Sequence, residues 1–378
     1  MRGTRRWLLG AASGSALTVL SACRATEGEE QSSCIPATGP DPGPSESGTS
    51  TEEVGAAGRA GPRKSSVLSP VGLAVSPDGT LVAANQTWDR KFLDLSVSDG
   101  TVLWDTSDGR IVHRFDNGAS GAIAWHPDGD LLAIGGQSRV FLTDASGSRS
   151  WTLAGHARDV DPFPLITDLD FSPDGSALAS LSTDGTVRLW SVSSSACEPR
   201  KVLRVRGMRA RSLSFSPDGS TLAICGPGGT PELWDPASGR RVSRLRDLDA
   251  TAFGVAHASD GTLLIGTGDE DLQDPAEPPA LYLRDPAGDI RKGPQPPNAA
   301  AEMLAVSESG KRVAVGGEVA QNVMVWDRDS DERQDPPRVG STTARLRWAP
   351  DETVLYAVGV RTSVLAWAGS DWSEFETP

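Results

Sequence analysis

Histidine is scarce in this chain, with only four among its 378 residues, and none forms a His-x-x-x-His pair. The sequence also has no nucleophile elbow, no glycine-rich phosphate-binding loop and no convergent set of imidazoles for a metal. The acidic run at residues 268–274 lacks the spaced carboxylates of a calcium loop, so it is interpreted as a solvated loop. We therefore expect no catalytic residue, no metal, no cofactor and no enzymatic activity.

Long apolar runs are also absent, apart from one stretch at residues 7–20. That stretch, about 14 residues long, is too short for a membrane-spanning helix. It follows Arg2, Arg5 and Arg6 and ends in Leu-Ser-Ala-Cys at Cys23, an order typical of an export signal. Residues 1–23 are therefore predicted to be a signal peptide that takes no part in the fold.

The end of this segment resembles the bacterial lipobox, in which the cysteine becomes the lipid-bearing first residue. The resemblance implies that Cys23 is lipidated and that the mature protein is anchored to the outer face of a bacterial cytoplasmic membrane; simple secretion is the alternative. Residues 4–9 resemble a twin-arginine export motif. General export is the alternative there, because 31 of the 36 basic residues in the whole chain are arginines.

Acidic residues outnumber basic ones, which gives a net charge of −14, or about −17 after removal of the signal. Such a protein is repelled by phosphates, so nucleic acid is excluded as a partner, and acyl chains rather than charge would hold it at a membrane. Residues 24–62 are rich in Gly, Ser, Thr, Pro and Glu. They are predicted to form a disordered tether about 130 Å long at full stretch.

What the chain does contain is a pattern that occurs seven times between residues 71 and 367. Each copy has an apolar run, a Pro-Asp-Gly turn or its variant, a second apolar run and, in most copies, a third run ending in Trp. The third residues of these turns are Gly79, Gly129, Gly175, Gly219, Gly261, Gly310 and Glu352. Their spacing of 42 to 50 residues, with period-two alternation, predicts one four-stranded blade for each copy.

The best copy, LDFSPDGSALASLSTDGTVRLW at residues 169–190, resembles a WD40 repeat. The resemblance covers roughly 300 residues and implies an all-β fold, a seven-bladed WD40-type β-propeller over residues 63–378, which we expect to be a monomer. The middle residue of the first strand is small in most copies, as expected between two neighbouring blades. Asp170 and Arg347 break this rule, so both are expected near a water-filled central channel.

Two segments could supply the fourth strand of the last blade and close the ring. Residues 63–68 resemble the fourth strands at residues 110–115 and 240–245, so the N-terminal segment is predicted to close the ring. The alternative is residues 371–376. Either closure would remove the exposed edges of an open array.

The WD40 family often has a buried His–Ser/Thr–Asp–Trp network, and the resemblance assigns this structural role to His156, Ser180, Asp184 and Trp190, with Ser182 as an alternative to Ser180. Gly228 stands where the next blade would need the aspartate. Three cysteines besides Cys23 leave an odd number outside the cytoplasm. A Cys197–Cys225 disulfide is one possibility, and a buried, apolar role for Cys225 is the other, with Cys34 left over in the tether.

Two surface features are candidate contacts for an unknown protein or envelope partner. The excursion at residues 85–98 carries Trp88, Arg90 and Phe92, which would either anchor a partner or cover the blade surface. A basic belt lies on the third and fourth copies, where it would either dock an anionic partner or protect strand edges from pairing. The belt residues selected as contacts are Arg204, Arg206, Arg209, Arg211 and Arg244.

These observations predict a non-catalytic, membrane-tethered interaction scaffold outside the cytoplasm. The alternative is an enzyme or small-molecule receptor that uses the central channel, as quinoprotein dehydrogenases and lactonases built on propellers do. The Asp-x-x-x-Gly turns at residues 105–109 and 235–239 are similar to those of several propeller families. A channel function would require several polar residues to converge around Asp170.

Overall fold

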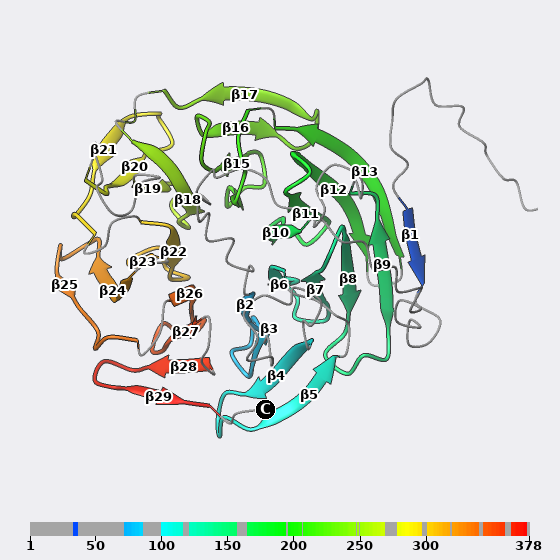
Figure 1. The fold of residues 1–378 in the computed structure, drawn as a ribbon, viewed down its shortest axis with the longest axis horizontal. Helices are drawn as coiled ribbons and strands as arrows, with labels where there is room; N and C mark the ends of the chain where they lie inside the picture. Colours follow the sequence, from blue (N-terminus) through cyan, green and yellow to red (C-terminus); the bar gives the residue numbers. More distant parts are fainter. Residues whose placement is uncertain are drawn as a thin grey trace, which may run out of the picture. The chain divides into compact units, whose positions relative to one another are not determined.

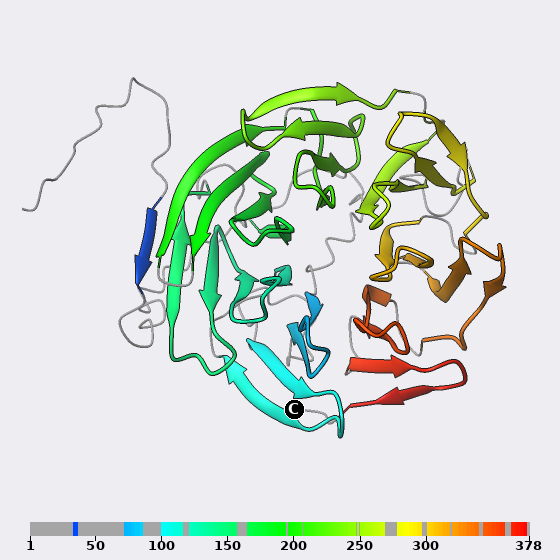
Figure 2. The same ribbon diagram turned by 180° about the vertical axis from the view of Figure 1, so that it is seen from behind.

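The strands form blades in the order of the sequence, and the computed structural model shows seven of them arranged in a ring (Figures 1 and 2). It describes Ser33–Pro36 and residues 72–85, 100–115, 121–156, 165–193, 196–205, 207–246, 248, 250–268, 278–296, 301–317, 320–339, 343–359 and 364–375. The predicted all-β, seven-bladed propeller is confirmed. Within these ranges there is no helix of the length and apolarity that a membrane crossing requires.

Each blade is an antiparallel sheet in which the first strand lies nearest the centre of the ring and the fourth lies at the outside (Figure 1). Blade one consists of β2 (Leu73–Val75), β3 (Leu81–Asn85), β4 (Thr101–Asp105) and β5 (Ile111–Phe115). Blade two consists of β6 (Ile123–Trp125), β7 (Leu132–Gly135), β8 (Arg139–Thr143) and β9 (Ser150–Ala154). Blade three consists of β10 (Ile166–Phe171), β11 (Ala177–Ser182), β12 (Thr186–Ser193) and β13 (Ala196–Arg204).

The remaining four blades follow the same order. Blade four consists of β14 (Ser212–Phe215), β15 (Leu222–Cys225), β16 (Glu232–Asp235) and β17 (Arg240–Arg244). Blade five consists of β18 (Thr251–His257), β19 (Leu263–Gly268), β20 (Leu281–Arg284) and β21 (Ile290–Lys292). Blade six consists of β22 (Met303–Val306), β23 (Arg312–Gly317), β24 (Ala320–Asp327) and β25 (Arg333–Gln334). Blade seven consists of β26 (Thr343–Trp348), β27 (Leu355–Gly359), β28 (Val364–Trp367) and β29 (Trp372–Glu374).

The repeated turn between the first two strands of a blade has a specific hydrogen-bond pattern. In blade one, Ser76 Oγ donates to Asp78 Oδ1 at 2.6 Å, and the Thr80 amide donates to the same oxygen at 3.0 Å. Gly79 follows with φ of 73°, a conformation that glycine adopts without a steric cost. The seventh copy has Glu352 at this position with φ of 61°, so the turn forms there without glycine.

The core is divided among the interfaces between blades. Seven apolar clusters of described residues each join two neighbouring blades, including the last to the first. The cluster between blades two and three, for example, contains Leu178 and Trp190, both with no exposed surface. Burial on both faces explains why the first three strands of each blade read as nearly continuous apolar runs.

The ring is closed by the C-terminal segment, so the prediction that residues 63–68 supply the last strand is wrong. Strand β29 pairs with β28, where Leu365 lies opposite Glu374 and Trp367 opposite Trp372. Phe375 follows directly and packs against Tyr356, with ring centroids 5.8 Å apart. The physical reason is local: a short turn after β28 brings the next residues back along its edge, without a closure over the whole ring. Residues 63–68 lie outside the described residues.

An additional strand, β1 (Ser33–Pro36), lies on the outer edge of blade two. It pairs antiparallel with β9, with Ser33 opposite Ala154 and Pro36 opposite Trp151 (Figure 1). These four residues fall within the range predicted to be a disordered tether, so that prediction is wrong for them. The outer strand of a blade offers a row of unpaired backbone groups, which an extended segment of almost any composition can satisfy.

A central channel and a basic rim as candidate sites

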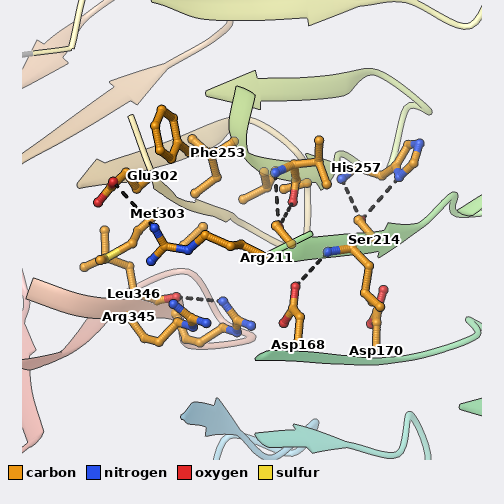
Figure 3. A pocket seen from close by; sticks show the side chains of 18 of the residues that line it. Asp168, Asp170, Arg211, Ser214, Phe253, His257, Glu302, Met303, Arg345 and Leu346 are labelled. Carbon is orange, nitrogen blue, oxygen red and sulfur yellow. Dashed lines mark hydrogen bonds and ion pairs between the residues drawn. The ribbon is translucent and has the colours of Figure 1, made fainter. Parts of the chain in front are cut away.

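The inner strands of blades three to seven enclose a cavity of about 290 Å³ at the centre of the ring (Figure 3). Seven charged or titratable side chains line it: Asp168, Asp170, Arg211, His257, Glu302, Arg345 and Arg347. Asp170 and Arg347 therefore line the channel, where the sequence placed them. Asp168, Glu302 and Arg345 were not predicted to line the channel, because they do not occupy the middle position of the inner strands at which the repeats were compared.

The two aspartates of blade three are held by the backbone of the next blade. Asp168 Oδ2 accepts a hydrogen bond from the Leu213 amide, and Asp170 Oδ2 accepts one from the Phe215 amide, both at 2.8 Å. These two amides are two residues apart on β14, the same spacing as the two aspartates on β10. One oxygen of each carboxylate is thereby fixed, which orients both groups at the channel wall.

Blade four repeats this arrangement toward blade five with serines. The Val255 amide donates to Ser212 Oγ at 3.2 Å, and the His257 amide donates to Ser214 Oγ at 3.0 Å. Side chains on one inner strand thus satisfy backbone groups on the next, in steps of 43 to 45 residues. The channel wall is a chain of polar contacts around part of the ring, in addition to the apolar clusters between the blades.

The arginines of blade seven extend into the same channel. Arg345 donates from a guanidinium nitrogen to the Thr167 carbonyl oxygen at 3.1 Å, which joins blade seven to blade three. Arg347 donates to the Leu346 carbonyl oxygen at 3.0 Å. On the other side of the cavity, Arg211 lies 3.8 Å from the nearly buried carboxylate of Glu302 (Figure 3). Arg211 is therefore a channel residue, and its assignment to the outer belt is wrong.

Burial dominates the titration of the channel groups. It raises the pKa of Asp170 to about 7, against the hydrogen bond from Phe215, while the charge of Asp168 raises it further and that of Arg347 lowers it. Burial likewise raises the pKa of Asp168, and the positive charge of Arg345 opposes this. The pKa of His257 is lowered to about 4, mainly by burial, so its imidazole is neutral at neutral pH.

The structure brings together the four residues assigned to the interior network of blade three. The indole nitrogen of Trp190 donates to Ser180 Oγ at 3.0 Å, Ser180 Oγ lies 2.8 Å from His156 Nε2, and His156 Nδ1 lies 3.0 Å from Asp184 Oδ2. Thr186, which the sequence analysis did not include, lies 3.1 Å from His156 Nδ1. Burial lowers the pKa of His156, so a neutral imidazole donates from Nδ1 to Asp184 and accepts at Nε2 from Ser180.

The basic belt is divided between two roles. On blade four, Arg244 and Arg241 lie 2.9 and 2.8 Å from Oε1 of Glu232, a carboxylate with only 2% of its surface exposed. Five basic residues lie on or directly after the outer strands β13 and β17, near the exposed Val202 and Val242 in the sequence. We call these seven residues the basic rim: Arg200, Lys201, Val202, Arg204, Arg240, Val242 and Arg246. Arg209 lies on the segment before β14.

Trp88, Arg90, Phe92, Arg206 and Cys23 lie outside the described residues. So does the acidic run at 269–274, and no group of three potential metal ligands occurs in the part of the chain that the structure describes.

The cysteine alternatives are resolved in favour of a buried, apolar role for Cys225. Its thiol is free, has no exposed surface, and belongs to the cluster between blades four and five. Burial raises its pKa. A Cys197–Cys225 disulfide is therefore wrong, because Cys197 belongs to β13 of blade three and Cys225 packs toward blade five.

Comparison with known proteins gives matches to parts of the chain. The family model described as WD domain, G-beta repeat matches residues 147–191, which include β9 of blade two, β10 and β11 of blade three, and all but the last two residues of β12. The chain is 33% identical to the transcriptional corepressor LEUNIG_HOMOLOG of Arabidopsis thaliana over 119 residues, which is 30% of this chain and 13% of that protein. It is 31% identical to the small ribosomal subunit protein RACK1y of Oryza sativa subsp. japonica over 127 residues, 32% of this chain and 34% of that protein.

The matched parts span at most about a third of the length of these two relatives. Among solved structures, hydrazine synthase of Kuenenia stuttgartiensis superimposes with a TM-score of 0.64 over 81% of this chain and 97% of that one, at 16% identity. This likeness concerns the fold alone. Together, the matches show a WD40 repeat in a seven-bladed β-propeller, an architecture typical of protein-interaction scaffolds.

Proposed function

We propose that this protein is a non-catalytic interaction scaffold, exported and held by a lipid on Cys23 at the outer face of a bacterial cytoplasmic membrane. Its basic rim holds an acidic partner, either a protein segment or an envelope component. The observation that carries the proposal is the rim itself: arginines next to exposed valines on a protein with a net charge of −14. Arginine with adjacent apolar surface is the composition that anchors interfaces.

The rim is one continuous surface across two blades. A Cβ atom built on Gly239, in the turn before β17, would lie 3.1 Å from Cδ of Lys201 on β13. Val202 and Val242 are 40% and 60% exposed on these two outer strands. Two acids border this surface: the exposed Glu198 at the start of β13, and Asp235, whose pKa is lowered mainly by hydrogen bonds from Ser238 and also by the charge of Lys201. The charges of the rim itself are positive, so an acidic partner gains both attraction and apolar contact.

Edge protection is the competing account of the same arginines, and Arg241 and Arg244 support it in part because they bind Glu232. For Arg200, Arg204 and Arg240 the described residues contain no ion pair, so the rim arginines are not explained by contacts inside the blade. Outer edges of this ring can also accept a strand, as β1 does on blade two. An extended acidic segment along β17 would combine strand pairing with charge.

The channel cavity favours a second candidate function, a receptor for a small molecule. Its charged side chains converge as a binding site requires, and at about 290 Å³ it has the size of a small ligand pocket. The quinoprotein and lactonase comparison has no further support, because the structural likeness at 16% identity concerns the fold alone.

The scaffold proposal is tested by cross-linking in living cells, followed by capture of the tagged protein from membranes and identification of its companions. We expect an acidic companion that is lost from an Arg200→Gln, Arg204→Gln, Arg240→Gln triple variant. Arg110→Gln is the matched control, because its side chain is 80% exposed on blade one, away from the rim. Equal recovery from the triple variant and the control would overturn the role of the rim.

The anchor is tested separately with Cys23→Ala. We expect the wild-type protein in the membrane fraction and the variant in the soluble extracytoplasmic fraction. If both fractionate with the membrane, or if neither does, lipidation of Cys23 is not what holds the protein there.

A further inference from the structure

Two positions of the inner strands form two layers across the channel. In the first layer, Asp168 of blade three and Arg345 of blade seven occupy equivalent strand positions. In the second layer, Asp170 and Arg347 do the same, two residues further along each strand. Both layers therefore have a carboxylate from blade three and a guanidinium from blade seven among the residues that line the cavity; Figure 3 labels Asp168, Asp170 and Arg345.

The first layer is bridged directly. Arg345 reaches across to the carbonyl of Thr167, the residue next to Asp168, at 3.1 Å. This contact joins two blades that are distant in the ring, and its charge lies close enough to lower the pKa of Asp168 against the effect of burial. The first layer thus has a structural role, because it connects blade seven to blade three across the channel.

The second layer is open. Asp170 accepts from the Phe215 amide and Arg347 donates to the Leu346 carbonyl, but within the described residues these two side chains form no ion pair with each other. The other blades present small residues at the same strand position: Ala74, Ala124, Ser214, Ala256 and Ala305. Two opposite charges of this layer therefore line the cavity, and the other five blades place no large side chain between them at this strand position.

Leaving two opposite charges apart in a partly buried cavity is unfavourable unless water or a ligand satisfies them. Each is already oriented by one backbone hydrogen bond, so a ligand would not have to order them. The lining has equal numbers of acidic and arginine side chains, three of each, which fits a ligand with no net charge. Phe253 and Met303, both nearly buried, add apolar surface to the wall.

We propose that the second layer binds a small zwitterion of amino acid size, with its carboxylate on Arg347 and its ammonium group on Asp170. The cavity holds the equivalent of about ten water molecules in liquid volume, which suits a free amino acid rather than a folded peptide. This inference builds on the receptor candidate and is independent of the scaffold proposal.

The test uses the full chain and saturation-transfer NMR with the proteinogenic amino acids as probes, followed by calorimetry on those that bind. We expect at least one amino acid to bind, and its amide and N-acetyl derivatives, which each lack one charge, to bind about tenfold more weakly. Arg347→Gln is expected to weaken the free amino acid about tenfold and to leave its amide derivative unaffected. Asp170→Asn is expected to weaken binding of the free amino acid about tenfold as well, because it removes the partner of the ammonium group. Binding of the N-acetyl derivative, which has no ammonium group, should be unaffected.

Arg204→Gln on the basic rim is the matched control and is expected to leave amino acid binding unchanged. Circular dichroism of both channel variants checks that the ring still forms, and the two variants provide independent evidence if one does not fold. The inference is overturned if no amino acid binds at millimolar concentration, or if binding is unchanged in Arg347→Gln and Asp170→Asn. If no amino acid binds, the proposal that the rim captures an acidic partner is unaffected. If the rim captures no partner, the proposal that the channel binds an amino acid is unaffected.

Discussion

Blades three and four differ in how they provide a hydrogen-bond acceptor for a buried tryptophan. Both have a buried tryptophan in the third strand, whose indole N–H needs an acceptor. Trp190 donates to Ser180, which belongs to a network inside the blade that contains a neutral His156 and the buried carboxylate of Asp184. Trp234 donates to Glu232 Oε2 at 3.0 Å.

Glu232 is in turn held by Arg241 and Arg244 on the outer strand, so the network of blade four is ionic and reaches the surface. Gly228 occupies the place of Asp184 in this blade, and the network does not need it. The feature common to the two blades is therefore a buried tryptophan whose indole N–H donates to a side-chain acceptor. The polar groups that satisfy it can come from inside the blade or from its edge.

The largest expected effect comes from breaking the interior network. The Asp184 and His156 side chains are 1% and 0% exposed, so Asp184→Ala removes the carboxylate from a buried imidazole and leaves the Thr186 hydroxyl, 3.1 Å from Nδ1, as its acceptor. We expect a loss of about 3–4 kcal/mol in the free energy of unfolding, measured by urea denaturation. Asp184→Asn, which keeps an oxygen acceptor, should lose less than half as much. Equal losses in both variants would show that the network depends on charge rather than on the acceptor.

A smaller effect is expected in blade four. Glu232→Gln keeps an acceptor for Trp234 but removes the charge that holds two arginines. Because the Arg241 and Arg244 side chains are more than a third exposed, water replaces most of what they lose, and we expect about 1–2 kcal/mol. The difference from wild type should shrink as salt is added, whereas that of Asp184→Ala should not. Glu198→Gln, an exposed glutamate on β13, is the control and should be neutral.

The channel provides a third carboxylate environment, which is sensitive to pH. The pKa of Asp170 is raised to about 7 in the folded state, so the wild type loses stability as the pH rises from about 4 to 7, while the unfolded chain releases its proton first. Asp170→Asn keeps the acceptor for Phe215 and cannot ionise. We therefore expect the variant to gain about 1 kcal/mol relative to wild type between pH 5 and pH 6, by urea denaturation at each pH. A constant difference across this range would contradict the assigned pKa.

The smallest expected effect on stability comes from an arginine of the rim, in contrast to the arginines that bind Glu232. Arg200→Gln removes an exposed arginine that holds no carboxylate within the described residues, so we expect a change of less than about 0.5 kcal/mol in stability. Tm measurements on Arg200→Gln and Glu232→Gln compare an arginine of the rim with the carboxylate that binds Arg241 and Arg244. A large loss from Arg200→Gln would assign this part of the rim to stability as well.

Most of the fold could be predicted from the sequence because its repeated turn has local causes. Pro, Asp and Gly at fixed positions define a turn in any copy, and the spacing then gives the number of blades. The interior network of blade three has the same property, since each member stands at a fixed offset within one repeat. Asp170 and Arg347 were placed at the channel because charges are costly elsewhere on an inner strand.

What could not be predicted depends on contacts between segments that no short pattern links. Glu232 looks like an ordinary polar residue at the start of a strand, and only the approach of Arg241 and Arg244 from β17 explains its burial. The bond between Arg345 and Thr167 joins residues 178 positions apart. Ring closure was predicted from likeness between fourth strands, but the outcome depended on the short connection to β29.

The strand added to blade two would change the mechanics of the attachment proposed above. If Cys23 carries a lipid anchor, nine residues (24–32) separate it from β1, and nine residues span about 30 Å at full extension, compared with about 130 Å for the 39 residues 24–62. A pull on such an anchor would load the hydrogen bonds between β1 and β9 before it loads the ring. The distance between the propeller and the proposed membrane would then be set by four residues at the edge of one blade.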